Sequence, residues 1–201
     1  MKLKTYVKII QALGENTKCT RKEVGAIIVK GDRIVSTGYN GLPSGSDDTI
    51  CKKNCRGCEL TVHAEMNAIL FAAKSGVCTQ DSDLYVTFSP CLNCAKHIIN
   101  AGIKNVYFIE MYDKPEGIQA INLLAQYCDN VYQIYREKGN KKWGLANMST
   151  VAAEIRKKQY LKPPKEDLIE ATKVRATQVL GKGIEEMTQG PQMKLPLGDK
   201  K

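Results

Sequence analysis

The sequence lacks any long run of apolar residues. No stretch of its 201 residues approaches the roughly 20 consecutive apolar positions that a membrane-spanning helix needs. The first 18 residues interrupt their apolar positions with Lys4, Lys8 and Gln11, so they do not build the apolar core of a signal peptide. We therefore expect a cytoplasmic protein with no membrane partner.

Histidine is scarce, whereas cysteine is not. The chain has two histidines, His63 and His97, and eight cysteines. In a reducing compartment, cysteines clustered at short spacings bind metal more often than they form disulfides. This composition favours metal sites over a disulfide framework.

Length and charge divide the chain into two parts. The 43% hydrophobic content predicts one compact domain, which we place at residues 1–139. Residues 140–201 carry 13 Lys and Arg against 7 Asp and Glu, which is two thirds of the net charge of +9. We expect them to form a basic C-terminal extension, helical at 149–160 and 164–180 and then disordered.

Hydrophobic periodicity predicts alternating strands and helices in the first part. The predicted strands are 24–30, 33–39, 83–89, 105–112 and 130–136. The predicted helices are 3–13, 61–76, 91–102 and 117–127. This order is typical of a three-layer α/β/α sandwich around a five-stranded mixed sheet.

Two connections predict the strand directions. Gly31-Asp32 forms a short turn between the first two predicted strands, which indicates an antiparallel hairpin. The helical run 117–127 separates the last two strands, and a crossover helix allows these strands to run parallel.

A histidine and a glutamate lie two positions apart in the segment TVHAEMNAIL. His63 and Glu65 alone are weak evidence, because a histidine at a helix start is more often a cap or a core residue. However, Pro90-Cys91-Leu92-Asn93-Cys94 follows a predicted strand and opens a helix. Both sulfurs then share one face, where the helix N-terminus lowers thiol pKa values.

One nitrogen and two sulfurs form a catalytic zinc site with a fourth position for water. We predict that His63, Cys91 and Cys94 bind this zinc, which lowers the pKa of a bound water toward about 7. Glu65 can lie beside that water without coordinating the metal, and we expect it to move the proton.

The pattern H-x-E followed by P-C-x-x-C is the signature of zinc deaminases. In both motifs and in the predicted order of elements over roughly residues 1–136, the sequence resembles the cytidine/deoxycytidylate deaminase superfamily. GYNGLPSG at 38–45, with VGAIIV, HAEMNAI, LYVTFSPCLNCAK and INAGIKNVYF, resembles deoxycytidylate (dCMP) deaminases of phage or bacterial type. The crossover helix agrees with the branch of dCMP, tRNA and polynucleotide deaminases and argues against the small free-nucleoside enzymes.

The resemblance implies hydrolytic deamination of dCMP to dUMP and ammonia, which would supply dUMP for thymidylate synthesis. Glu65 would protonate N3 of the cytosine and then the departing amine. The Ala64 N–H and the Ser89 carbonyl would read the pyrimidine edge, and Tyr112 would pack against the nucleotide. The amide of Asn40 offers a donor and an acceptor for a sugar hydroxyl or a base edge.

The resemblance also implies regulation and assembly. Deoxycytidylate deaminases are commonly hexamers that dCTP with Mg²⁺ activates and dTTP inhibits. The residues that match their effector loop are Gly38, Tyr39, Asn40 and Gly41. We therefore expect both effectors, Mg²⁺ with dCTP, a homohexamer and, for a phage-encoded chain, action in the host cytoplasm.

A second cysteine cluster predicts a structural zinc. Three thiols fall within eight residues of a long polar loop, and a fourth precedes the first strand. The predicted ligands are Cys19, Cys51, Cys55 and Cys58. His97 competes for this shell, but a lone helix histidine is usually packed or hydrogen-bonded, so we leave it out. Cys78 and Cys128 have no clustered partners and are expected in the core.

Other questions stay open at this point. The basic extension suggests a deaminase of tRNA or single-stranded DNA, although only Tyr160 follows Trp143 as an aromatic that could stack on bases. A second alternative is a catalytically inactive, zinc-stabilised binding module, but this hypothesis has to explain why Glu65 is intact beside the predicted ligands. The candidates for the phosphate contact are Arg21, Lys22 and Arg56.

Overall fold

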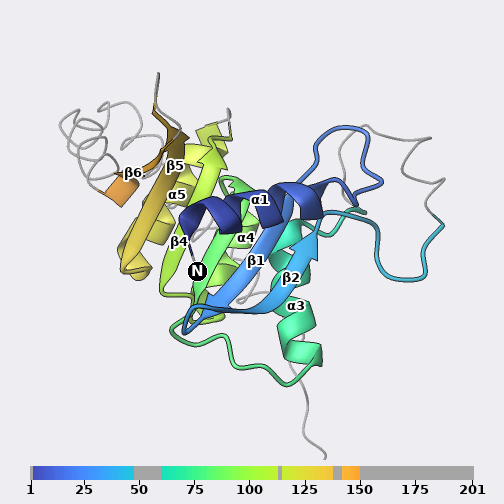
Figure 1. Cartoon of the computed structure of the whole chain (residues 1–201). Helices are drawn as coiled ribbons and strands as arrows, with labels where there is room; N and C mark the ends of the chain where they lie inside the picture. Colours follow the sequence, from blue (N-terminus) through green and yellow to red (C-terminus); the bar gives the residue numbers. More distant parts are fainter. Residues whose placement is uncertain (1, 48–59, 113–114, 138–141, 150–201) are drawn as a thin grey trace, which may run out of the picture. The chain divides into compact units, whose positions relative to one another are not determined.

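A mixed sheet between two helical layers forms the described part of the chain, in a computed structural model that covers residues 2–47, 60–112, 115–137 and 142–149 (Figure 1). The strands are β1 Gly25–Lys30, β2 Arg33–Tyr39, β3 Asp83–Phe88, β4 Asn105–Glu110, β5 Asn130–Arg136 and β6 Trp143–Asn147. The helices are α1 Leu3–Gly14, α3 Ala64–Lys74, α4 Leu92–Asn100 and α5 Pro115–Tyr127. The α/β/α sandwich predicted from the sequence is confirmed.

The sheet order is β2-β1-β3-β4-β5-β6. β1 pairs antiparallel with β2 and with β3, whereas β3, β4 and β5 run parallel. The parallel pairing of β4 with β5 confirms the prediction from the crossover helix. β1 and β2 meet through Gly31 and Asp32, which have φ angles of +54° and +60° and therefore form the kind of tight turn that suits a hairpin.

The expected count of five strands is wrong by one, because β6 adds a sixth at the edge of the sheet. β6 pairs antiparallel with β5, from Tyr132 opposite Asn147 to Arg136 opposite Trp143. Its sequence, WGLAN, is short and has no β-branched residue, so periodicity alone does not reveal it. It lies in the segment that we assigned to the extension, and residues 150–201 of that extension lie outside the described residues.

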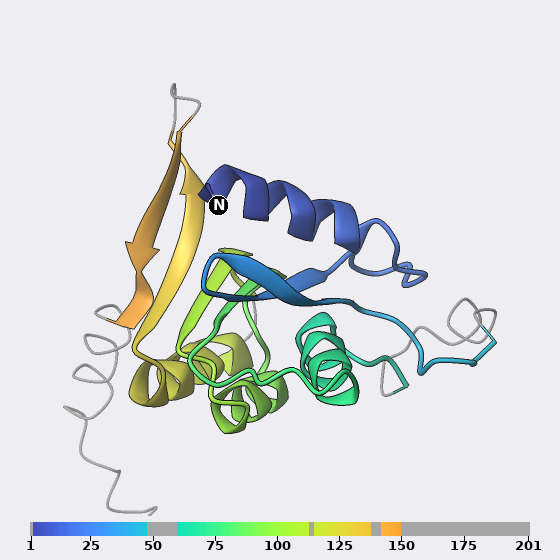
Figure 2. The same ribbon diagram turned by 60° about the horizontal axis from the view of Figure 1, so that its bottom comes forward.

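Each face of the sheet has its own helical layer. Figure 2 shows α1 alone on one side and α3, α4 and α5 together on the other. α1 buries Tyr6, Val7 and Ile10 against Ile27 and Tyr85 of the sheet. This arrangement leaves the N-termini of α3 and α4 on the same side of the sheet, where the two metal-ligand motifs begin.

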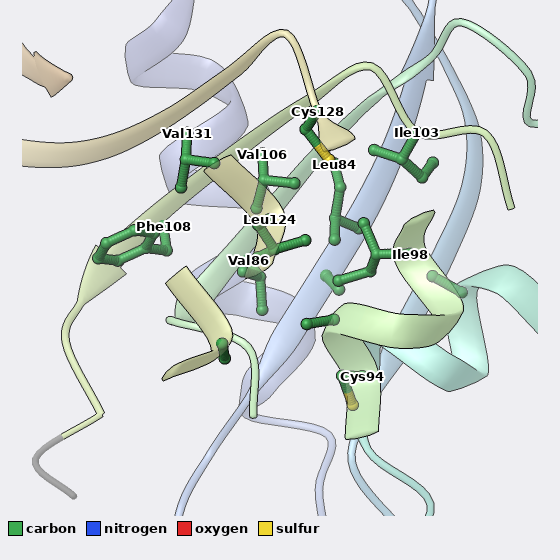
Figure 3. Close-up of a cluster of buried hydrophobic side chains, with 14 of the residues drawn as sticks. Leu84, Val86, Cys94, Ile98, Ile103, Val106, Phe108, Leu124, Cys128 and Val131 are labelled. Carbon is green, nitrogen blue, oxygen red and sulfur yellow. The ribbon is translucent and has the colours of Figure 1, made fainter. Parts of the chain in front are cut away.

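The larger core lies between the sheet and the three-helix layer (Figure 3). Leu84, Val106, Phe108 and Leu124 are fully buried there. Cys94 lies in the first turn of α4 at the edge of this core, so close packing fixes the position of its sulfur. A predicted metal ligand thus lies at the edge of the hydrophobic core.

The two unclustered cysteines differ in their environments. Cys128 is buried in the larger core, as expected. Cys78 is exposed, so the expectation that it is a core residue is wrong. It lies in the loop between α3 and β3, where its carbonyl accepts a hydrogen bond from the Lys30 ammonium. A single cysteine in a loop offers no periodic pattern from which its burial could be inferred.

Gly38 of β2 allows the strand to pass very close to α3. A Cβ atom at this position would lie 2.3 Å from the Ala64 carbonyl oxygen and 2.5 Å from the Ala68 nitrogen, both backbone atoms that cannot swing away. α3 begins directly after His63, so this contact also determines where the metal-ligand motif lies.

We expect Gly38→Ala to lower the free energy of unfolding by about 1–3 kcal/mol, because the added methyl group pushes α3 from the sheet. Urea denaturation measures this loss. Gly41→Ala is the matched control, since its Cβ would have 4.0 Å of clearance. Equal stability of both variants and the parent chain would contradict the close packing described here.

Candidate functional site

Two helix N-termini bring the predicted metal ligands together. His63 is the N-cap residue of α3, and Cys91 is the N-cap residue of α4. β3 leads through Ser89 and Pro90 into Cys91, so the end of the central strand delivers this thiol to the site. Cys94 follows in the first turn of α4.

The distances fit a tetrahedral zinc ion. The His63 Nδ1 atom lies 3.5 Å from the Cys91 sulfur and 3.4 Å from the Cys94 sulfur. A zinc ion with ordinary Zn–N and Zn–S bond lengths separates a nitrogen and a sulfur ligand by about 3.6 Å at the tetrahedral angle. All three donor atoms lie within 4.8 Å of one another. The residues present therefore fit the metal predicted for them.

The two thiols shift each other's pKa values in opposite directions. A hydrogen bond from the Cys94 thiol lowers the pKa of Cys91 to about 3, and the same bond raises the pKa of Cys94. The hydrogen bond to Cys91 also raises the pKa of His63. A metal ion displaces the protons of these groups when it binds, because it coordinates thiolates and neutral imidazole.

Glu65 lies in the first turn of α3 and is only 4% exposed. Burial raises the pKa of its carboxyl group. A buried carboxyl group with a raised pKa beside a metal site is suited to general acid–base chemistry.

A pocket of about 270 Å³ is lined by two of the three predicted ligands, His63 and Cys91. Its lining residues are Cys19, Arg21, Lys22, Val24, Asn40, Thr61, His63, Ala64, Glu65, Phe88, Ser89, Cys91 and Tyr112. The pocket brings together Glu65 and all four residues that we predicted to contact a substrate. It also includes two of the three cations considered for the phosphate, whereas Arg56 lies outside the described residues.

Ser89 fixes one wall of this pocket. Its side-chain oxygen accepts a hydrogen bond of 2.7 Å from the Tyr112 backbone N–H. Its own N–H donates to the Glu110 carbonyl at 2.7 Å, which ties the segment after β3 to the end of β4. Both residues are thereby held at the carboxyl ends of parallel strands, a common place for ligand sites in α/β proteins.

The predicted effector loop lies next to the same pocket. Gly41 exchanges two backbone hydrogen bonds with Val62, the residue before His63. The Tyr39 carbonyl accepts a hydrogen bond from Asn67 of α3, and the Tyr39 side chain is 43% exposed. Residues 38–41 are therefore tied to the start of α3.

Cys19 and His97, the two remaining candidates for metal binding among the described residues, lie in different environments. Cys19 is half-buried and lines the pocket, whereas the other three predicted ligands of the structural zinc lie outside the described residues. His97 is exposed on α4, where its Nδ1 atom forms a hydrogen bond of 2.7 Å with the Asn93 carbonyl. This contact agrees with leaving His97 out of the metal shell.

Sequence reasoning missed Val24, Thr61 and Phe88 as pocket residues. Phe88 had a usable signal, because it ends β3 directly before Ser89 and so had to lie near the site. Val24 and Thr61 begin a predicted strand and a predicted helix, but both lie in loops just before β1 and α3, and their place in the pocket depends on how these loops fold.

Known proteins resemble this chain in sequence and in fold. Residues 1–110 match the family model described as the cytidine and deoxycytidylate deaminase zinc-binding region. The chain belongs to the cytidine and deoxycytidylate deaminase family. It is 34% identical over 188 residues to the deoxycytidylate deaminase of Enterobacteria phage T2, a match that covers 68% of this chain and all of that one.

Solved structures of this family agree. The dCMP deaminase of cyanophage S-TIM5 in complex with dCMP and dUMP has a TM-score of 0.56 and 34% identity, and the match covers 66% of this chain and 98% of that one. Its apo form has a TM-score of 0.56 and 36% identity. The chain is therefore an enzyme of the hydrolytic deaminase class. Within the described part of the chain, none of its helices combines the length and apolar character of a membrane span.

Proposed function

We propose that this enzyme converts dCMP to dUMP and ammonia. The observation that carries the proposal is the convergence of His63, Cys91 and Cys94 at zinc-ligand distances, next to a pocket that buried Glu65 lines together with His63 and Cys91. The phage relatives named above as deoxycytidylate deaminases support the choice of substrate.

His63, Cys91 and Cys94 would hold the zinc, which when bound lowers the pKa of a water toward about 7 and so supplies a nucleophile at neutral pH. Glu65 takes the proton released from the water and delivers it to N3 of the cytosine. The oxygen of that water bonds to C4, and Glu65 then moves the remaining proton of this oxygen to the 4-amino nitrogen. The C4–N bond breaks to release ammonia, and C4 keeps the oxygen as the carbonyl of dUMP. Burial of Glu65 suits this task because a raised pKa makes the carboxyl group a usable acid.

Backbone groups orient the base. Ala64 is the first residue of α3, so its N–H has no acceptor within the helix and can donate to the pyrimidine O2. The Ser89 carbonyl can accept a hydrogen bond from the 4-amino group. Tyr112 and Phe88 supply aromatic surface for the nucleotide, and the Asn40 amide can form a further hydrogen bond to the sugar.

A structural zinc is a further part of the proposal. Cys19 lies on the pocket rim, and Cys51, Cys55 and Cys58 fall in the polar loop that follows the effector segment in sequence. Four thiolates would close the shell and stabilise a loop that has little apolar content.

We also propose that Gly38, Tyr39, Asn40 and Gly41 take part in regulation by dCTP with Mg²⁺ and by dTTP, in a cytoplasmic homohexamer. Their hydrogen bonds to Val62 and Asn67 support this idea, because a change in the loop would be transmitted to α3 and hence to His63.

The test is steady-state deamination of dCMP, deoxycytidine, dCTP and a cytosine-containing oligonucleotide, with and without dCTP plus Mg²⁺. We expect turnover of dCMP to exceed that of the other three substrates, dCTP to raise the rate at low dCMP and dTTP to lower it. Turnover of the oligonucleotide alone would overturn the proposal in favour of a polynucleotide deaminase. Hyperbolic kinetics unaffected by either triphosphate would remove only the regulation.

A further inference from the structure

A short segment before β1 carries positive charge to the pocket. Arg21 and Lys22 both line it, together with Cys19 and Val24 from the same segment. Glu65 is the only acidic residue in the described lining of the pocket, and it lies buried beside the metal ligands. Arg21 and Lys22 therefore make this the cationic side of the pocket, because Glu23 of the same segment is exposed and does not line it.

Lys22 is held against the aromatic wall of the pocket. Its ammonium nitrogen lies 3.9 Å from the centre of the Phe88 ring and 5.6 Å from that of Tyr112. Aromatic faces attract a cation without using up its N–H donors in strong hydrogen bonds. An ammonium group has three such donors, so Lys22 is prepared to bind an anion at the pocket wall.

Asn40 fastens this segment to the end of β2. Its side-chain amide donates to the Lys22 carbonyl at 2.9 Å and accepts from the Val24 N–H at 2.9 Å. Its backbone N–H donates to the Val24 carbonyl at 3.1 Å, and its carbonyl accepts from the Thr17 hydroxyl. Asn40 is only 6% exposed, so these bonds are shielded from competing water.

We propose that Lys22 binds the 5′-phosphate of the substrate and selects the nucleotide over the nucleoside, and that Asn40 is the positioning residue that holds Lys22 in place. This inference rests on the proposed function, because it assigns the phosphate contact of the same substrate. A monophosphate is a dianion at neutral pH, and a charge-assisted hydrogen bond to it is stronger than a neutral one. The nucleoside offers no charge to Lys22.

The decisive quantity is kcat/KM for dCMP divided by kcat/KM for deoxycytidine. We expect Lys22→Gln to lower this ratio on the order of 10- to 100-fold, since it removes a charged hydrogen bond from one substrate only. Lys22→Arg should restore most of the ratio. Lys18→Gln removes the same charge from an exposed site just before this segment and outside the pocket lining, and it should keep the parent ratio.

Inhibition by product gives a second measurement that does not depend on the turnover rate. We expect Lys22→Gln to raise the inhibition constant of dUMP by a similar factor and to leave that of deoxyuridine within about threefold. A thermal unfolding midpoint close to that of the parent chain shows that the variant is folded.

Asn40→Ala separates positioning from direct contact. If Asn40 acts through Lys22, KM for dCMP rises and the ratio of kcat/KM for dCMP to that for deoxycytidine falls. If Asn40 only contacts the sugar, kcat/KM falls equally for both substrates. A purely structural role lowers the unfolding midpoint without changing the ratio. Equal losses on both substrates would overturn the positioning role.

The outcomes distinguish the two proposals. A zinc-loaded parent enzyme that does not turn over dCMP sinks the proposed function itself. A parent enzyme that prefers dCMP, together with a Lys22→Gln variant that keeps this preference within threefold, leaves the proposed function intact and overturns the assignment of Lys22.

Discussion

Replacing Glu65 by glutamine lowers kcat for dCMP by about 10²- to 10⁴-fold, the range that general acid–base catalysis contributes. The substitution keeps the size of the side chain but removes its ability to carry a proton. Glu65 lies beside the three ligand atoms rather than among them, so the zinc content stays the same. Stopped or steady-state assays of dUMP formation, with metal analysis of the same sample, measure both effects.

The control for this prediction is Glu110→Gln. Glu110 ends β4 near the site and is exposed, and it is absent from the pocket lining. The same change from carboxylate to amide there should alter kcat less than twofold. Retention of more than a tenth of the parent kcat by Glu65→Gln would show that another group moves the proton.

Loss of a metal ligand has the second large expected effect. We expect Cys94→Ser to remove one zinc ion per chain and to lower activity at least about 10³-fold, because the metal supplies the nucleophile. Under the proposal of a structural zinc, the count falls from about two to about one. Cys91 and His63 cannot hold zinc firmly by themselves, since the site has three protein ligands.

Cys128→Ser is a matched control, because Cys128 is also a buried cysteine of the larger core but lies outside the metal cluster. Both variants put a hydroxyl group into an apolar region, so both should lose stability in urea. Only Cys94→Ser should lose zinc and activity together. A Cys94→Ser protein with full zinc content and full turnover would refute the ligand set.

The sequence predicted the parts of the fold that repeat regularly. α1 shows apolar residues at helical spacing, and α3 is rich in strong helix formers. The glycines that follow α3 and α4, Gly76 and Gly102, have φ angles of +66° and +69°, as helix stops require. The crossover helix predicted the parallel pairing of β4 and β5. β6 escaped detection because an edge strand is specified by its partner strand rather than by its own pattern.

The candidate site was predictable where spacing fixes geometry. His63 and Glu65 share the start of one helix, and Cys91 and Cys94 share the start of another, so each pair follows from local structure alone. The two pairs come together only because the sheet places the starts of these two helices side by side. Local structure does not predict this, and the prediction came from the known zinc deaminase signature, which combines both motifs.

The role of Asn40 could not be read from the sequence in the same way. Its side-chain amide forms hydrogen bonds with Val24 and Lys22, which lie 16 and 18 positions earlier in the chain, and no local sequence pattern reveals such contacts. Gly38 is similar, because its backbone contact with Ala64 arises only when β2 and α3 pack together.

The central claim is that this pocket replaces the 4-amino group of dCMP by an oxygen from water. The most direct measurement is incubation of the zinc-loaded enzyme with dCMP in ¹⁸O-labelled water, followed by mass spectrometry of the nucleotide and assay of ammonia. We predict dUMP with one labelled oxygen at C4 and an equal amount of ammonia. Unchanged dCMP, with zinc bound by His63, Cys91 and Cys94, would contradict the account.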